Sequence, residues 1–275
     1  MWNRNDFLAT APGGAVGMIH LQPLPGSPLW GGDLDAVRSA ALADADALVE
    51  GGFGAAMIEN YHDVPFHPDV VPAHTVAALT AMVAAVRARH PGLALGVNVL
   101  RNDVASALGI AAATGAAFVR VNVHVGAAAT DQGPLTGRAW HTLRLRRELG
   151  IGHVGIMADV RVKHARPLVE RPLAEEAADL RLRGLADAVI VTGPATGAAA
   201  DPADLAIVRA ELPDCPLLVG SGATAASVAG LLAHADGCIV GSSLQKVDPA
   251  TGRKRADAGL ARAFLAAAEA ARRKG

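Results

Sequence analysis

The stretch from Val119 to His124 reads Val-Arg-Val-Asn-Val-His, so valine alternates strictly with polar or charged side chains. A period of two is typical of a β-strand, with the valines on one face and Arg120, Asn122 and His124 on the other. A valine face suits a covering layer of helices. The opposite, polar face then predicts a strand whose inner side lines the interior of a barrel near its mouth.

This strand lies within a regular alternation of short apolar runs and longer alanine-rich stretches. Pro72, Pro172 and Pro202 stand where helices are expected to begin, and proline is tolerated in a first helical turn. Eight strand–helix units without a linker indicate a parallel sheet, and 275 residues suit one closed (β/α)8 TIM barrel better than an open sheet. The expected strands cover residues 15–21, 55–58, 94–99, 117–123, 154–160, 188–192, 216–219 and 237–240. The expected helices cover residues 33–50, 72–90, 103–114, 136–149, 172–183, 202–211, 224–233 and 258–272. We therefore expect a single α/β domain over residues 1–275, with residues 1–14 as an N-terminal extension.

The composition excludes several classes of protein. Hydrophobic residues make up 51% and charged residues 19%, which excludes a disordered chain. The formal net charge is −1, from 25 basic and 26 acidic side chains, and so argues against a nucleic-acid partner. The two cysteines, Cys215 and Cys238, form no metal-binding or disulfide pattern, and the expected compartment is the reducing cytoplasm.

Membrane segments are not expected either. Apolar runs end well short of about 18–20 residues, and residues 1–14 lack the pattern of a signal peptide. The run Arg272-Arg273-Lys274 is the one hint of peripheral membrane contact, and it also suits the C-terminus of a helix, where positive charge complements the dipole.

Polar residues follow the predicted strands at their carboxyl ends, where active sites of such barrels lie. A buried Arg120 needs a carboxylate partner, and Asp159 and Glu59 are the candidates. Asp159 or Glu59 is the expected general base, with His20 or His124 as the acid, and Asp159→Asn is expected to abolish turnover without unfolding the protein. Which carboxylate acts depends on which one pairs with Arg120, because the pKa of the paired carboxylate is expected to be depressed. The alternative is a buried ion-pair network that only supports the barrel.

Further residues at these ends are candidates for contact with a ligand. Lys163 suits a Schiff-base nucleophile if burial lowers its pKa, and otherwise an anion contact or a surface lysine. The candidates for substrate binding are Asn98, Arg101, Asn102, Arg120, Asn122 and Thr192. A divalent cation, if one is bound, would use His20, Glu59, His124 and Asp159, although no local spacing motif supports it. No organic cofactor is expected.

Two glycine-rich turns follow the seventh and eighth predicted strands, and these are the loops that hold phosphate in many barrels. Glycine lets backbone N–H groups approach an anion closely. The alternative is that these glycines only form tight βα turns, in which glycine is common. The predicted phosphate ligands are Gly220, Ser221, Gly222, Gly241 and Ser242.

Several long motifs resemble the BtpA/SgcQ family. They are residues 17–28 (GMIHLQPLPGSP), 59–66 (ENYHDVPF), 96–103 (GVNVLRND), 120–124 (RVNVH) and 158–165 (ADVRVKHA). The resemblance covers nearly the whole chain and implies a ribulose-phosphate-binding-type barrel. The namesake of the family is a cyanobacterial protein peripheral to the thylakoid membrane and linked to photosystem I biogenesis, and other members occur in sugar-metabolism operons. One departure is residues 245–249 (QKVDP), where the family tends to have a Lys-Asp-Gly run.

Two functions follow as expectations. The first is an enzyme that isomerises, epimerises or cleaves a small phosphorylated sugar or phosphoribosyl-type metabolite. The second is a non-catalytic biogenesis or stability factor for a membrane complex. A phosphate-ligand sensor would differ from the enzyme only in lacking a product. Barrels of this type often form homo-oligomers, and the alanine-rich, lysine-poor composition suits a bacterial source with a GC-rich genome.

Overall fold

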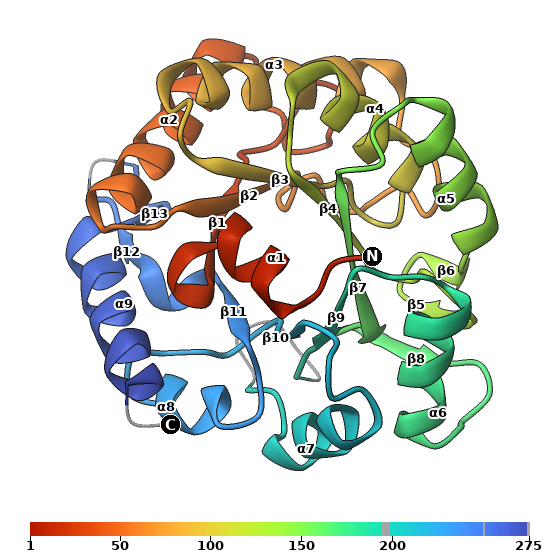
Figure 1. Ribbon diagram of the computed structural model, residues 1–275. Helices are drawn as coiled ribbons and strands as arrows, with labels where there is room; N and C mark the ends of the chain where they lie inside the picture. The colour runs from red at the N-terminus through yellow and green to blue at the C-terminus, as the bar shows by residue number, and fades with distance from the viewer. Residues whose placement is uncertain (194–198, 250, 274–275) are drawn as a thin grey trace.

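The computed structural model describes residues 1–193, 199–249 and 251–273. Eight strands close into a barrel in the order β1–β11–β10–β9–β7–β4–β3–β2, and every neighbouring pair is parallel (Figure 1). The predicted TIM barrel is confirmed. The barrel strands are β1 (Ala15–His20), β2 (Ala55–Glu59), β3 (Ala94–Asn98), β4 (Phe118–Val121), β7 (Gly155–Arg161), β9 (Ala188–Val191), β10 (Leu217–Val219) and β11 (Gly237–Val240).

A ring of helices surrounds the barrel, as Figure 1 shows. Acidic residues fix several helix starts, because the carboxylates of Asp33, Asp103, Asp201 and Asp257 accept hydrogen bonds from backbone N–H groups of the first turn. The helices are α2 (Leu34–Glu50), α3 (Ala73–Arg89), α4 (Val104–Thr114), α5 (Ala139–Glu148), α6 (Leu173–Ala178) with the π-helical turn η2 (Asp179–Arg183), α7 (Pro202–Glu211), α8 (Val228–Leu232) and α9 (Ala258–Arg272). None of the helices in the described ranges is long and apolar enough to cross a membrane.

Strand β4 shows how the alternation sorts side chains. Val119 and Val121 belong to the layer between barrel and helices, whereas Phe118 packs inside the barrel among methionine and aliphatic side chains. Gly96 on the neighbouring strand leaves room for the Phe118 ring, because a Cβ there would overlap it. The lower part of the barrel interior is therefore apolar, and polar groups gather above it at the mouth.

Residues 1–14 cover the amino-terminal end of the barrel. They contain the helix α1 (Arg4–Thr10) and the 3-10 turn η1 (Pro12–Gly14), and α1 lies in front of the barrel centre in Figure 1. Phe7 is fully buried against the apolar interior, and Gly237 lies so close to its ring that a side chain would not fit. The expected extension thus closes one end of the barrel.

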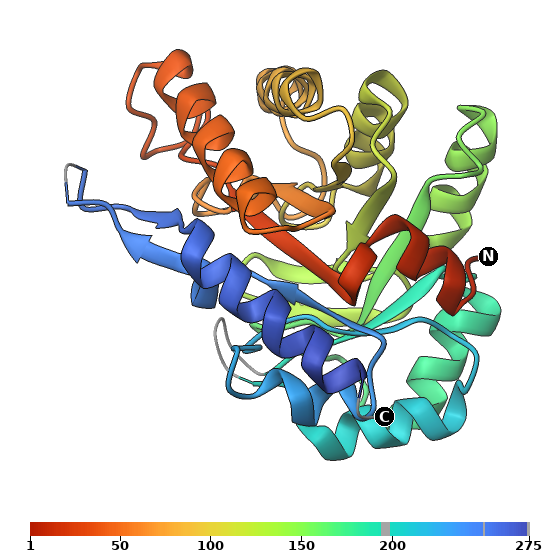
Figure 2. The ribbon, with the colours of Figure 1, turned by 60° about the vertical axis from the view of Figure 1, so that its left-hand side comes forward.

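Two small sheets lie outside the barrel, and the sequence pattern did not predict them. The hairpin of β5 (Ala127–Thr130) and β6 (Gly133–Thr136) joins β8 (Ala165–Pro167) in a three-stranded antiparallel sheet beside the mouth. The hairpin of β12 (Gln245–Val247) and β13 (Lys254–Ala256) follows the 3-10 turn η3 (Ser242–Leu244) and stands out from the barrel in Figure 2. Both sheets consist of strands of three or four residues, too short for a period of two to be recognised.

Candidate active site

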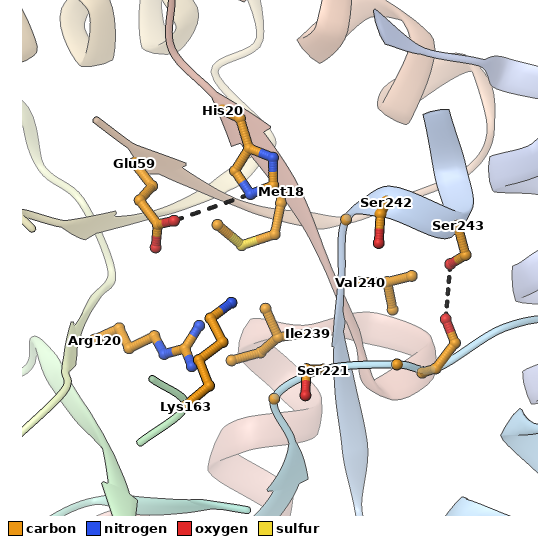
Figure 3. A pocket seen from close by; sticks show the side chains of 14 residues that line it. Met18, His20, Glu59, Arg120, Lys163, Ser221, Ile239, Val240, Ser242 and Ser243 are labelled. Atoms are coloured by element: carbon orange, nitrogen blue, oxygen red, sulfur yellow. Dashed lines mark hydrogen bonds and ion pairs between the residues drawn. The ribbon is translucent and has the colours of Figure 1, made fainter. Parts of the chain in front are cut away.

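A cavity opens at the carboxyl ends of the barrel strands. Figure 3 shows that its two sides differ in chemistry. One side is built from charged and titratable side chains on or just after β1, β2, β4 and β7, and the other from glycine and serine in the loops after β10 and β11. The lining residues are Met18, His20, Glu59, Arg120, Lys163, Gly220, Ser221, Gly222, Ala223, Ile239, Val240, Gly241, Ser242 and Ser243.

Arg120 pairs with Asp159 and not with Glu59. Its Nη2 and Nε atoms donate to the two carboxylate oxygens at 2.9 and 3.0 Å, and both side chains are almost completely buried. The amide Nδ2 of Asn122 donates to Asp159 Oδ2 at 3.2 Å. Asp159 therefore uses both oxygens to hold its neighbours, which leaves Glu59 as the carboxylate free to act on a ligand.

Strand register brings Glu59 to the cavity beside His20. His20, Glu59 and Asn98 lie opposite one another on the adjacent strands β1, β2 and β3. Asn98 Nδ2 donates to Glu59 Oε2 at 2.5 Å, whereas Glu59 Oε1 faces His20 Nε2 at 3.9 Å. That separation is too long for a direct hydrogen bond, and it leaves Oε1 and Nε2 available to the same ligand oxygen or water.

His20 is held as a neutral imidazole. Burial lowers its pKa to about 4, against the opposing effect of the Glu59 carboxylate. The ring stacks on Tyr61 with centroids 4.3 Å apart, and Gln245 Nε2 lies 3.5 Å from Nδ1. A donor at Nδ1 favours the tautomer that carries its proton on Nε2, the atom that faces Glu59.

Lys163 enters the cavity beside Arg120 (Figure 3). Its Nζ forms no hydrogen bond or ion pair with any residue that the structure describes. Burial lowers the pKa of this ammonium group below its usual range, and the nearby Arg120 guanidinium adds to the effect, while Glu59 and Asp159 oppose it. Lys163 thus places an amine that has no partner among the described residues close to the reacting groups.

The opposite side of the cavity offers backbone N–H groups. The hydroxyl of Ser243 donates to the Ala223 carbonyl at 2.7 Å and ties the two loops together. Within the described ranges, no hydrogen bond uses the N–H groups of Gly222, Ala223, Ser242 or Ser243. Gly241 packs against His20 and Met18. All five predicted phosphate ligands line this cavity.

Four of the other predicted residues support the site from outside the cavity. Asn98 fixes Glu59, as described above. Arg101 donates from Nη2 to the Lys163 carbonyl at 2.8 Å, and Asn102 exchanges two hydrogen bonds with the backbone of Val123. Thr192 donates its hydroxyl proton to the Arg161 carbonyl at 2.7 Å. These side chains hold the ends of β3, β4, β7 and β9 in place.

The structure does not bring His124 to the site. The regular strand β4 ends at Val121, so the alternation that was expected to aim His124 into the mouth stops before this residue. Its Nε2 lies 2.8 Å from the Gly184 carbonyl at the end of η2, and burial lowers its pKa. A ring nitrogen facing a carbonyl carries the proton, and His124 acts here as a buried structural donor.

The four residues proposed as metal ligands therefore do not converge. His124 points elsewhere and Asp159 is occupied by Arg120 and Asn122, which leaves His20 and Glu59. No cluster of three or more His, Cys, Asp or Glu side chains suited to a metal ion occurs in the part of the chain that the structure describes.

The sequence did not predict several residues of the site, and three of them illustrate why. Tyr61 stacks on His20, Ser243 links the two loops, and Ala223 contributes to the cavity wall. A signal for Tyr61 was present, because it follows directly after the strand end at Glu59-Asn60. Ser243 and Ala223 act through backbone position, which residue type alone does not show.

The comparisons with known proteins agree with this architecture. A family model described as the BtpA family matches residues 13–270. The photosystem I biogenesis protein BtpA of Synechocystis sp. is 44% identical over 232 residues, which are 84% of this chain and 80% of that protein. An uncharacterized protein of Thermococcus kodakarensis is 47% identical over 232 residues, 84% of this chain and 86% of the relative. The relatives are mostly archaeal, so the expectation of a bacterial source is not supported.

Solved structures share the fold at low sequence identity. A native KDPGal structure has a TM-score of 0.58 and 16% identity, and the match covers 94% of this chain and 96% of that chain. N-(5'-phosphoribosyl)anthranilate isomerase from Pyrococcus furiosus has a TM-score of 0.56 and 15% identity, covering 93% and 98%. Both matches support the barrel fold that the family resemblance implied. At such identities the likeness concerns the fold alone.

Proposed function

The chain belongs to the BtpA family, and from this premise we propose that it is an enzyme for a small phosphorylated sugar or phosphoribosyl-type metabolite. The proposed reaction is an isomerisation, an epimerisation or an aldol-type cleavage. One observation carries the proposal: a single cavity places backbone N–H groups opposite an acid–base pair and a lysine, and neither these N–H groups nor the lysine side chain has a partner among the described residues. The fold neighbours include an isomerase whose name specifies a phosphoribosyl substrate.

The phosphate is proposed to bind between the loops after β10 and β11. The N–H groups of Gly222, Ala223, Ser242 and Ser243 have no competing acceptor in the described chain, and the Ser242 side chain is exposed in the cavity. Backbone donors are fixed before the ligand arrives, so binding an anion requires little reorganisation. Arg120 supplies positive charge on the facing side, and Lys163 adds to it when its amine is protonated.

The reacting end of the substrate would then lie between Glu59 and His20. Glu59 Oε1 is the proposed base that removes a proton from the carbon next to a carbonyl group, while the neutral His20 donates from Nε2 to the carbonyl oxygen. Asn98 keeps Glu59 in position. Asp159 holds Arg120 in place, and the Arg120 guanidinium lines the cavity as a fixed cation. These steps use side chains of the chain itself and no organic cofactor.

Lys163 can take part in this chemistry in two ways. With a lowered pKa it is either a second base or the amine that condenses with a substrate carbonyl to give an imine and water. The first version suits isomerisation or epimerisation, and the second suits aldol-type cleavage.

The name of the Synechocystis relative supports a second candidate, a biogenesis factor that acts by binding and not by turnover. A binding scaffold has no need for the Glu59 oxygen that faces His20 without a hydrogen bond. For this reason we place the enzyme first.

A thermal-shift screen tests the proposal. Ribose 5-phosphate, other phosphorylated sugars, inorganic phosphate and divalent metal salts are added separately, and a specific phosphorylated sugar is expected to raise the melting temperature. At a ligand concentration a hundredfold above Kd, binding raises the free energy of unfolding by about 2.7 kcal/mol.

A matched pair of variants shows whether that ligand binds at the loops. Ser242→Glu places a carboxylate in the cavity and is expected to abolish the shift. Ser39→Glu adds the same charge on the exposed face of α2 and is expected to retain it. If no phosphorylated sugar stabilises the folded wild-type protein, the biogenesis factor becomes the better account.

A further inference from the structure

A second, larger cavity adjoins the first and has a different chemistry. It lies between the three-stranded sheet of β5, β6 and β8 and the helix α6. The buried ion pair lies between the two cavities, because Arg120 lines the first and Asp159 lines the second. We call the second one the side cavity.

The walls of the side cavity are mainly apolar. They come from the β4–β5 loop, β5, β7 and the segment from β8 to α6. The charged residues that reach it are already paired: Arg161 Nε with Glu176 at 2.8 Å, and Arg171 Nη1 with Asp179 at 2.7 Å. A phosphate group therefore meets no available cation here. The apolar wall residues include Val123, Val125, Val160, Val162, Ala165 and Leu168.

One polar atom of this lining lacks a partner. Asn122 lines the side cavity with 3% of its surface exposed, and its Oδ1 has no hydrogen-bond partner within the described ranges. Its Nδ2 donates to Asp159 Oδ2, which fixes the orientation of the amide, because the flipped amide would set two oxygens against each other. A buried acceptor without a donor is costly, so the site is complementary to a ligand that brings an N–H or O–H group.

We propose that the side cavity binds the non-phosphorylated end of the substrate, and that this end is an apolar ring bearing an N–H or O–H donor. This inference rests on the proposed function. The substrate class is then a phosphorylated sugar joined to such a ring. Its phosphate lies at the loops after β10 and β11, its sugar carbons lie at Glu59 and His20, and its ring lies beyond Asp159.

Three synthetic probes separate these contributions in calorimetric titrations. Ribitol 5-phosphate carries only the phosphorylated chain. Reductive amination of ribose 5-phosphate with aniline adds a phenyl ring and an N–H group, and the N-methyl derivative keeps the ring but removes the N–H. The phenylamino probe is expected to bind at least about tenfold more tightly than ribitol 5-phosphate, from burial of the ring. It is also expected to bind more tightly than its N-methyl derivative.

Variants show whether the tighter binding due to the ring and the N–H group arises in the side cavity. Leu168 is 55% exposed at this cavity, so Leu168→Glu introduces a charge there with little risk to folding and is expected to remove most of the advantage of the ring. Leu182 is 64% exposed and lines neither cavity, and Leu182→Glu is the matched control that retains the advantage. Asn122→Leu is expected to abolish the preference for N–H over N-methyl.

Each result has one meaning. Equal binding of ribitol 5-phosphate and the phenylamino probe overturns the side-cavity inference and leaves the proposed function standing. A ring advantage that survives Leu168→Glu also overturns the inference. If ribitol 5-phosphate and both ring probes all fail to bind the folded protein, the proposed function fails and the inference fails with it. If Asn122→Leu does not fold, the Leu168→Glu comparison still decides.

Discussion

Carboxylates are buried at both ends of the barrel, but they are used differently. At the amino-terminal end, Asp187 is 1% exposed and accepts hydrogen bonds from Arg146, from the Ile156 N–H and from the Trp2 N–H, at 2.5, 2.9 and 3.0 Å. At the carboxyl end, Glu59 is 3% exposed and accepts from Asn98, while its other oxygen faces His20 at 3.9 Å. Both oxygens of Asp187 thus accept hydrogen bonds, and we call such a carboxylate saturated. Glu59 is not saturated, because only one of its oxygens accepts a hydrogen bond.

The amino-terminal arrangement is repeated. Asp236 precedes β11 as Asp187 precedes β9, and its Oδ2 accepts from the Arg209 guanidinium at 2.6 Å and from the Leu217 N–H at 2.9 Å. Each aspartate thus links the preceding strand to an arginine of an earlier helix. Two copies of one bonding pattern indicate a structural role, since they hold neighbouring strands together.

Close pairing of both oxygens therefore separates structural from functional carboxylates better than burial does. Asp236 Oδ1 has Arg4 Nε at 2.6 Å, whereas Glu59 Oε1 has only His20 Nε2 at 3.9 Å. Leaving a buried carboxylate oxygen without a donor lowers stability, and such costs tend to persist where a ligand uses the group. Asp159 is the informative intermediate, because it lies at the mouth like Glu59 but is saturated like Asp187.

The largest expected effect is on turnover. Glu59→Gln keeps the shape of the side chain and the bond from Asn98 but removes the base, so kcat/KM for the substrate is expected to fall by about 10³-fold. The melting temperature is expected to change little. Asp187→Asn is the matched control at the other end, with lower stability but normal turnover of the folded fraction. Unchanged turnover in Glu59→Gln would remove this residue from the role of base.

The second-largest expected effect is on stability, and it concerns Asp159. Asp159→Asn leaves Arg120 with a buried charge and no carboxylate, and is expected to cost about 3 kcal/mol of unfolding free energy in urea titrations. Pairing with Arg120 thus changes the expectation for this residue from catalytic base to counter-ion. A variant as stable as the wild type, but without turnover, would instead make Asp159 the base and show that saturation is a poor criterion.

The sequence predicted the barrel and much of its mouth for identifiable reasons. Period-two valines and alanine-rich helices report burial directly, and Arg120, with valines on both sides, had to face inward and needed a carboxylate. Which carboxylate it meets depends on strand register, and register is a long-range property. The same limit explains His124, since the end of β4 is set by the loop that follows and not by the alternation.

The amino-terminal end was harder to anticipate. Asp187 and Asp236 each stand between small residues just before a strand, where the sequence shows only an isolated acid. Their arginine partners lie 41 and 27 positions away in the chain. Sequence position thus identifies the polar strand ends of the mouth but not the ion pairs that close the opposite end.

The smallest expected effect comes from His20 and is seen in the dependence of stability on pH. The folded protein holds the pKa of His20 at about 4, below its usual value of 6.5, so the unfolded chain binds a proton first as the pH falls. Between pH 6.5 and about pH 4 the unfolded state carries more protons, and the free energy of unfolding of the wild type falls in this window, by about 2 kcal/mol from this residue.

His20→Gln removes the contribution of this residue to the pH dependence. The free energies of unfolding from urea titrations at pH 7 and pH 4.5 are therefore expected to differ less in the variant than in the wild type. His153→Gln replaces an exposed histidine and serves as the matched control. Parallel pH profiles for His20→Gln and the wild type would mean that His20 is not held neutral, and the proton it is proposed to donate from Nε2 would then come from an imidazolium.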